Sequence, residues 1–220
     1  GARKDYRYGS AIYRRYALRI VEKMAEAVGD HPALVGWQID NEFGAHNSVL
    51  CYCDRCVTNF RAWLKNRYKT LENLNNSWGT VFWSQVYSNW EQIYPPNQTV
   101  AAPNPSQVLD YQRFASDSLV QYQQIQVDIL REGTQAQFIT HNPDLSDFNL
   151  DIHKLRKNLD FLSWNSSPTG LAAPKYFLEK DSLTAMDAGS TNAVSGSPNI
   201  ISWVKTLKTL LSAYRMSPHR

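Results

Sequence analysis

The sequence predicts an α/β fold in which helices alternate with the strands of a parallel sheet. A predicted helix at residues 11–28 stops at Gly29, and the apolar run that follows ends in Asn41 and Glu42. The same order of helix, short stop and apolar strand recurs at residues 107–142. Helix followed by strand is half of a βαβ unit, so its repetition favours parallel strands flanked by helices.

The apolar run before Asn41 and Glu42 is typical of a buried strand that presents polar groups at its carboxyl end. In parallel α/β folds this end opens on the ligand side of the sheet. There the Glu42 carboxyl group can act as a general acid, and the Asn41 amide can donate to a sugar hydroxyl. The alternative is that Asn41 and Glu42 merely begin a loop.

Caps and apolar spacing define the two longest predicted helices. Ser10 precedes the first and Ser106 the second, which runs over residues 107–131 and ends before Gly133. The first helix has apolar residues at three- and four-residue steps, namely Ile12, Tyr16, Ile20, Met24 and Ala27. The strand predicted at residues 135–142 ends in His141 and Asn142, and His141 either lines the site or caps the core.

Three cysteines, Cys51, Cys53 and Cys56, lie within six residues at the start of a predicted helix over residues 54–68. Three thiols this close cannot all pair, which favours a metal or free thiols and a reducing compartment. The helix amino end is expected to lower the pKa of the thiols. Zinc takes four ligands, so a fourth would come from His46, Asp54 or water.

An aromatic loop over residues 78–96 and two short elements complete the predicted organisation. The loop contains Trp-Gly-x-x-Phe-Trp-Ser-Gln, whose second tryptophan is Trp83. Exposed rings at this density indicate a binding role, while Trp78 and Trp90 are expected in the core. A short helix at residues 150–158 and a strand at residues 160–165 follow.

The Asn41-Glu42 pair at a strand end, the cysteine cluster nine residues later and the tryptophan loop resemble glycoside hydrolase family 42, the β-galactosidases. The resemblance implies a partial (β/α)8 TIM barrel, because a complete barrel needs about 250 residues. It further implies a retaining mechanism with Glu42 as general acid/base, and galactose contacts from Arg3, Asn41 and Trp83.

For the metal, the resemblance implies structural zinc on Cys51, Cys53 and Cys56. Arg7 stands where many family members have a fourth cysteine. A retaining glycosidase also needs a second carboxyl group as nucleophile, about 5–5.5 Å from the first. The sequence has no Asp or Glu from residue 188 to 220, and Glu179 reads as an ordinary acid. The nucleophile is therefore expected outside this chain.

One partial catalytic domain is expected over residues 1–220, with 1–170 resembling the family well and 171–220 poorly. Hydrophobic residues make up 43% of the chain, charged residues 20%, and the net charge is +3. The basic residues are dispersed, which disfavours nucleic-acid binding, and no apolar run is long enough to span a membrane. The expected partner is a β-galactoside substrate, and the expected location is the cytoplasm. A homo-oligomeric parent enzyme is compatible with the sequence.

Two other functions remain compatible with the sequence. One is another retaining β-glycosidase of the β-glucosidase or endoglucanase type, which also has an acid/base glutamate after an asparagine. The other is a non-catalytic, zinc-braced binding fragment. Arg3, Trp83 and the cysteines favour the β-galactosidase over the first of these.

Overall fold

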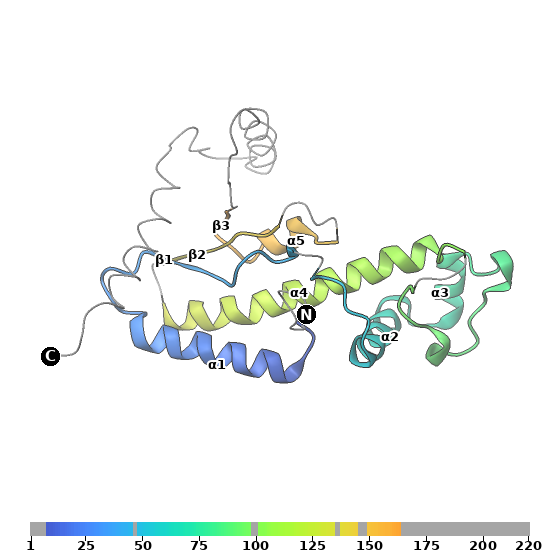
Figure 1. Cartoon of the computed structure of the whole chain (residues 1–220), viewed down its shortest axis with the longest axis horizontal. Helices are drawn as coiled ribbons and strands as arrows, with labels where there is room; N and C mark the ends of the chain where they lie inside the picture. The colour runs from blue at the N-terminus through green and yellow to red at the C-terminus, as the bar shows by residue number, and fades with distance from the viewer. Residues whose placement is uncertain (1–7, 46–47, 98–100, 135–136, 145–148, 164–220) are drawn as a thin grey trace, which may run out of the picture. The chain divides into compact units, whose positions relative to one another are not determined.

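The computed structural model describes residues 8–45, 48–97, 101–134, 137–144 and 149–163. Within these ranges helices alternate with short strands (Figure 1). The elements are, in chain order, α1 (Ala11–Val28), β1 (Gly36–Gln38), α2 (Asp54–Tyr68), α3 (Leu71–Trp78), the 3-10 turns η2 (Phe82–Ser84) and η3 (Trp90–Gln92), α4 (Pro105–Gly133), β2 (Phe138–His141), α5 (Ile152–Arg156) and β3 (Phe161–Leu162). None of the helices in these segments combines the length and apolarity needed to cross a bilayer.

Helix α1 has the predicted bounds, and the Ser10 side chain accepts a hydrogen bond from the Tyr13 N–H as predicted for its cap. The start of α4 differs from the prediction. Asn104, not Ser106, caps it, accepting hydrogen bonds from the N–H groups of Ser106 and Gln107. Pro105 fits the first helical position because its fixed φ suits a helix and it has no N–H group to satisfy.

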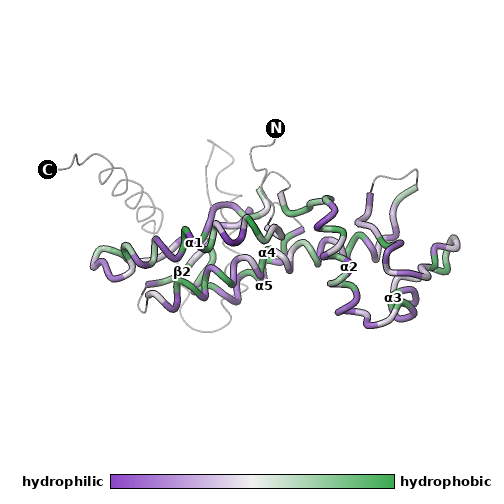
Figure 2. Tube along the Cα trace, turned by 90° about the horizontal axis from the view of Figure 1, so that it is seen from below, coloured by the Kyte–Doolittle hydropathy of each residue, from purple (hydrophilic) through white to green (hydrophobic). Residues whose placement is uncertain are grey.

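The apolar stripe that predicts α1 does not face the core. Ile12 and Ile20 are each 59% exposed, and Tyr16 and Met24 are exposed as well. The helix has a second apolar stripe one residue further along, Tyr13, Ala17, Val21 and Ala25, which packs into the core beside α4. Apolar and polar residues alternate along both helices (Figure 2).

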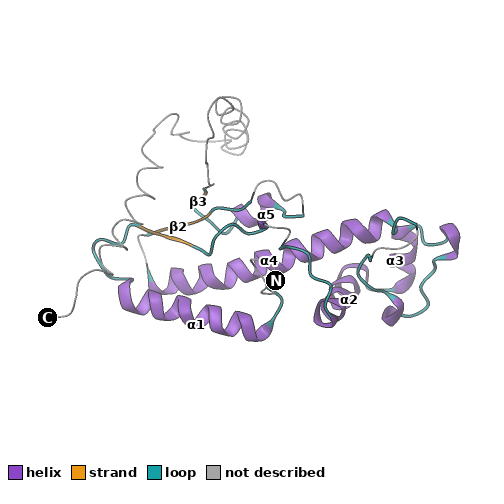
Figure 3. Ribbon diagram, in the orientation of Figure 1, coloured by secondary structure: helices purple, strands orange, loops and turns teal. Residues whose placement is uncertain are grey.

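The three strands form a parallel sheet in the order β1-β2-β3. Figure 3 shows the strands on one side of the α1 and α4 pair. Gly36 pairs with Phe138, and a Cβ at Gly36 would lie 2.4 Å from the Phe138 ring, so any side chain at this position would force that ring to move. The strands are shorter than the runs predicted at residues 135–142 and 160–165.

One apolar cluster fills the space between the sheet and the two long helices. Its fully buried members include Leu119, Ile139 and Leu155. Burying one such side chain stabilises the fold by about 1.5–3 kcal/mol. The ends of β1 and β2 are thus anchored on a packed helix pair.

A second cluster joins α2, α3 and the first half of α4. Phe60 and Leu64 of α2 are buried in it, and so is Trp78, as predicted. Trp90, also predicted in the core, is half-buried against the same cluster. At its polar centre lies Asp110, which is 1% exposed.

The Asp110 carboxylate ties the helices of the second cluster together. It accepts hydrogen bonds from the Tyr68 hydroxyl at 2.5 Å and from Trp78 Nε1 at 2.9 Å. It also forms ion pairs with Arg113 at 3.1 Å and Arg67 at 3.6 Å. Desolvation and the hydrogen bond to Asp110 raise the pKa of the Tyr68 hydroxyl, so Tyr68 remains a donor.

We predict that Asp110→Ala lowers the free energy of unfolding by about 2–4 kcal/mol, because it leaves the Tyr68 and Trp78 donors unsatisfied. Urea unfolding measures this. Asp128→Ala removes an exposed carboxylate from the same helix and is the matched control, with an expected change within about 0.5 kcal/mol. Equal stability of the two variants would contradict the role of Asp110.

Candidate functional site

The turn after β1 has an unusual backbone. The Ile39 N–H still donates to Thr140 O at 2.9 Å, which continues the strand pairing by one residue. Asp40 and Glu42 then take positive φ values of 49° and 50°. This left-handed conformation costs roughly 1–2 kcal/mol for a residue with a Cβ, so the turn needs support from its surroundings.

His141, at the end of β2, provides part of that support. Its Nδ1 lies 2.6 Å from Ile39 O, and its Nε2 lies 3.2 Å from the Phe43 N–H. A carbonyl can only accept and an N–H can only donate, so His141 holds its proton on Nδ1 and is neutral. The ring is fully buried and lies 4.0 Å, centroid to centroid, from the Phe43 ring. Of the two predicted roles, His141 therefore caps the core and does not line an open site.

Asn142 joins the same turn from the next position. Its Oδ1 accepts hydrogen bonds from Gln38 Nε2 at 3.0 Å and from the Glu42 N–H at 3.4 Å. Its Nδ2 donates to Asn41 Oδ1 at 3.1 Å. The sequence gives one signal for this contact, which is that polar residues end two neighbouring parallel strands. Which of these side chains bond to one another cannot be read from their spacing.

Asp40 forms a third connection, this time to α4. The Tyr122 hydroxyl donates to Asp40 Oδ2 at 3.5 Å, and Asp40 Oδ1 accepts from the Asn41 N–H at 2.7 Å. Burial raises the pKa of Tyr122, with the Tyr13 hydrogen bond and the Asp40 charge adding to the effect. Tyr122 therefore keeps its proton and links the turn to the helix pair.

The predicted site residues differ in how far the structure describes them. Glu42 is half-buried and Asn41 exposed, both on the turn that follows the carboxyl end of β1. Arg3, Arg7 and His46 lie outside the described residues, as does the segment 164–220 with Glu179. The backbone of Trp83 belongs to η2, but its side chain is outside the description.

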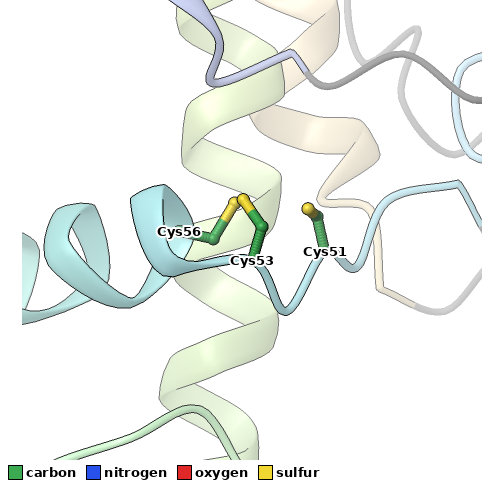
Figure 4. Close-up of side chains that lie close together, drawn as sticks. All are labelled: Cys51, Cys53 and Cys56. Atoms are coloured by element: carbon green, nitrogen blue, oxygen red, sulfur yellow. The ribbon is translucent and has the colours of Figure 1, made fainter.

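The three cysteines come together as predicted. The sulfur atoms of Cys51, Cys53 and Cys56 all lie within 4.8 Å of one another (Figure 4). Cys53 caps α2, and the Tyr111 hydroxyl donates to Cys51 O. Beside them, a cavity of about 30 Å³ is lined by Cys51, Cys56 and Ser48, among others, which is room for roughly one water.

The arrangement fits three of the four ligands of a tetrahedral thiolate site. Sulfurs bound to one zinc at about 2.3 Å lie about 3.8 Å apart, so the cluster needs only a small contraction. Asp54, a predicted fourth ligand, is not part of this group in the described chain. The cluster could hold a metal ion that braces the loop before α2.

The expected lowering of thiol pKa at the start of α2 is wrong for Cys56. Burial raises the pKa of this thiol, and hydrogen bonding and charge from Cys51 and Cys53 raise it further. Loss of hydration and the neighbouring sulfurs outweigh the helix dipole, which acts only over the first turn. Without a metal, Cys56 is a neutral thiol.

Comparison with known proteins gives consistent matches. The model of the family described as Beta-galactosidase, glycoside hydrolase family 42, matches residues 1–205. A β-galactosidase of Thermus sp is 49% identical over 170 residues, which are 77% of this chain and 26% of that protein. One of Haloferax lucentense is 41% identical over 195 residues, covering 89% of this chain and 29% of that protein.

Solved structures agree with the sequence matches. The β-galactosidase of the psychrophilic Marinomonas ef1 superposes with a TM-score of 0.73 at 44% identity, over 76% of this chain and 26% of that one. An exo-β-agarase, with a TM-score of 0.54 at 20% identity, shares the fold alone. This chain thus spans about a quarter of the length of the relatives it matches.

We predict that iodoacetamide alkylates Cys56 slowly in the folded, metal-free chain. A raised pKa leaves less thiolate at pH 8 than an ordinary thiol has, and the rate should climb as the pH increases. In urea the three cysteines should react alike. Mass spectrometry of the peptides measures each rate, and equal rates for Cys56 in the folded and unfolded chain would contradict the prediction.

Proposed function

Because this chain belongs to glycoside hydrolase family 42, we propose that it forms part of the catalytic domain of a β-galactosidase. The reaction is hydrolysis of terminal non-reducing β-D-galactose residues by a retaining double displacement. The observation that carries the proposal is that Glu42 is half-buried on the turn after the carboxyl end of a parallel strand, and that three side chains from other elements hold this turn.

In this mechanism Glu42 first donates a proton to the glycosidic oxygen as the aglycone leaves. It then removes a proton from the water that hydrolyses the galactosyl-enzyme intermediate. The nucleophile that forms the intermediate is not assigned to a residue of this chain. We propose that it lies in further polypeptide, since residues 188–220 contain no carboxylate side chain and the relatives are about three times as long as this chain.

Three residues are proposed to contact the galactose. Asn41 is exposed beside Glu42, so its amide is accessible to a ligand at the strand end. Arg3 and Trp83 rest on the family resemblance and on their sequence positions. Arg3 would bind sugar hydroxyls by hydrogen bonds, and Trp83 would present a flat apolar face to the sugar ring.

We propose that residues 1–220 are part of a (β/α)8 barrel. The parallel order β1-β2-β3, with helices between the strands, is the order found in such barrels. The exposed stripe of α1 also supports this reading. Ile12, Tyr16, Ile20 and Met24 form an apolar face of the kind that a neighbouring barrel helix covers.

We propose zinc as the metal of the cysteine cluster, with a structural role. Cys51, Cys53 and Cys56 would hold it, and it would fix the loop that follows Glu42 to the start of α2. The adjacent cavity would admit water as fourth ligand, and His46 is the alternative.

We predict that Glu42→Ala, in a full-length enzyme carrying this chain, lowers kcat/KM about 10²–10⁴-fold for galactosides with poor leaving groups. The loss should be much smaller for an activated nitrophenyl leaving group, which departs without a proton. Azide should restore turnover and yield β-galactosyl azide, detected by NMR. Glu91→Ala, at an exposed glutamate, is the control and should keep normal activity.

An equal loss for both kinds of leaving group, or no azide product, would contradict the general acid/base role of Glu42. Full activity of Glu42→Ala would contradict the proposed function itself.

We predict about one zinc per chain after reconstitution in reducing buffer, measured by elemental analysis. Cys53→Ser should weaken binding by more than the roughly 10–100-fold that losing an outer-shell partner costs. Ser48→Ala, beside the cluster but without a thiol, is the matched control. A zinc content that is unchanged in Cys53→Ser would contradict the assignment.

A further inference from the structure

We propose that Asn142 is a positioning residue for both Asn41 and Glu42, and that it turns the Asn41 amide so that its NH2 group serves as the donor to the sugar. This inference rests on the proposed function of Glu42. Asn142 is 2% exposed and follows β2 directly, so it acts through its neighbours without touching the substrate.

The orientation of the Asn142 side chain follows from one unambiguous donor. The Glu42 backbone N–H can only donate, so the Asn142 atom that faces it at 3.4 Å is the carbonyl oxygen. The Gln38 amide donates to the same oxygen at 3.0 Å. The opposite end of the Asn142 amide is therefore its NH2 group.

That orientation is passed on to Asn41. The Asn142 NH2 group needs an acceptor and meets Asn41 Oδ1 at 3.1 Å. With its oxygen turned toward Asn142, Asn41 presents its own NH2 group on the other side. A sugar hydroxyl at this position would accept a hydrogen bond from Asn41. The orientation of the Asn41 side-chain amide is therefore set by Asn142.

Glu42 depends on the same contact through its backbone. Its φ is 50° and its N–H donates to Asn142 Oδ1, so the hydrogen bond offsets part of the cost of this conformation. Without it, the turn can relax toward ordinary backbone angles and move the carboxyl group. A displacement of about 1 Å can reduce a rate about 10²-fold.

The test uses Asn142→Leu, which has a similar shape but no hydrogen-bonding groups, in the full-length enzyme. We expect kcat/KM to fall about 10–100-fold, with both kcat and KM affected. Asn104→Leu is the matched control. Asn104 also makes three side-chain hydrogen bonds, to Trp78 O and the N–H groups of Ser106 and Gln107, at the start of α4. This variant should lower thermal stability to a similar degree without changing kcat/KM.

A double-mutant cycle with Asn41→Ala separates positioning from a general loss of stability. If Asn142 acts partly through Asn41, the factor by which Asn142→Leu lowers kcat/KM should be at least threefold smaller in the Asn41→Ala enzyme than in the wild type. Purely multiplicative effects, or kcat/KM within twofold of wild type in folded Asn142→Leu, would overturn the proposal.

A second variant covers the case in which Asn142→Leu does not fold. Asn142→Asp keeps the acceptor for the Glu42 N–H but replaces the donor to Asn41 with an oxygen. The side-chain amide of Asn41 should then flip, so that its oxygen and not its NH2 group faces the sugar. Because the donor to the sugar hydroxyl is lost, we expect KM to rise at least tenfold. An unchanged KM would overturn the proposal.

The experiments distinguish an error in the proposed function from an error in the proposed role of Asn142. If Glu42→Ala is inactive and rescued by azide while both Asn142 variants behave as wild type, only the positioning is wrong. If Glu42→Ala is fully active, the proposed function fails, and the role of Asn142 fails with it.

Discussion

The parallel pairing of β1 with β2 is the constraint on which the site depends. Register places Gln38 beside Thr140, so the residues after each strand emerge at the same edge of the sheet. His141 and Asn142 can then contact the turn that follows β1, each through two of its polar atoms. A shift of the register by one residue would exchange the faces of these side chains and remove the contacts.

The packed helices supply the rigidity that this edge needs. Tyr122 reaches from α4 to Asp40, and Phe43 lies buried among the rings of Tyr8, Tyr122 and His141. The loop beyond leads to the cysteine cluster, where the Tyr111 hydroxyl, again from α4, holds Cys51 O. Helix α4 thus supports both the turn that carries Glu42 and the candidate metal site, and Asp110 fixes its first half to α2 and α3.

Local signals predicted much of this architecture. The bounds of α1 and its Ser10 cap depend on neighbouring residues only, and so does the helix that follows Cys53. The proximity of the three cysteines follows from their spacing at a helix start. Where a distant partner decides the outcome, local signals were not enough. Spacing does not say which of two apolar stripes α1 buries, and the expected lowering of the thiol pKa is wrong for Cys56, because burial raises it against the helix dipole.

The sequence by itself determined the alternation of helices and strands, the candidate carboxyl group at a strand end and the thiol cluster, because these follow from residue type and short-range spacing. Only the tertiary structure decided that His141 is a neutral cap and that Asn142 sets the orientation of Asn41. Those properties arise from hydrogen bonds between segments about a hundred residues apart in the chain. Such contacts exist only once the strands have paired and the core has excluded water around them.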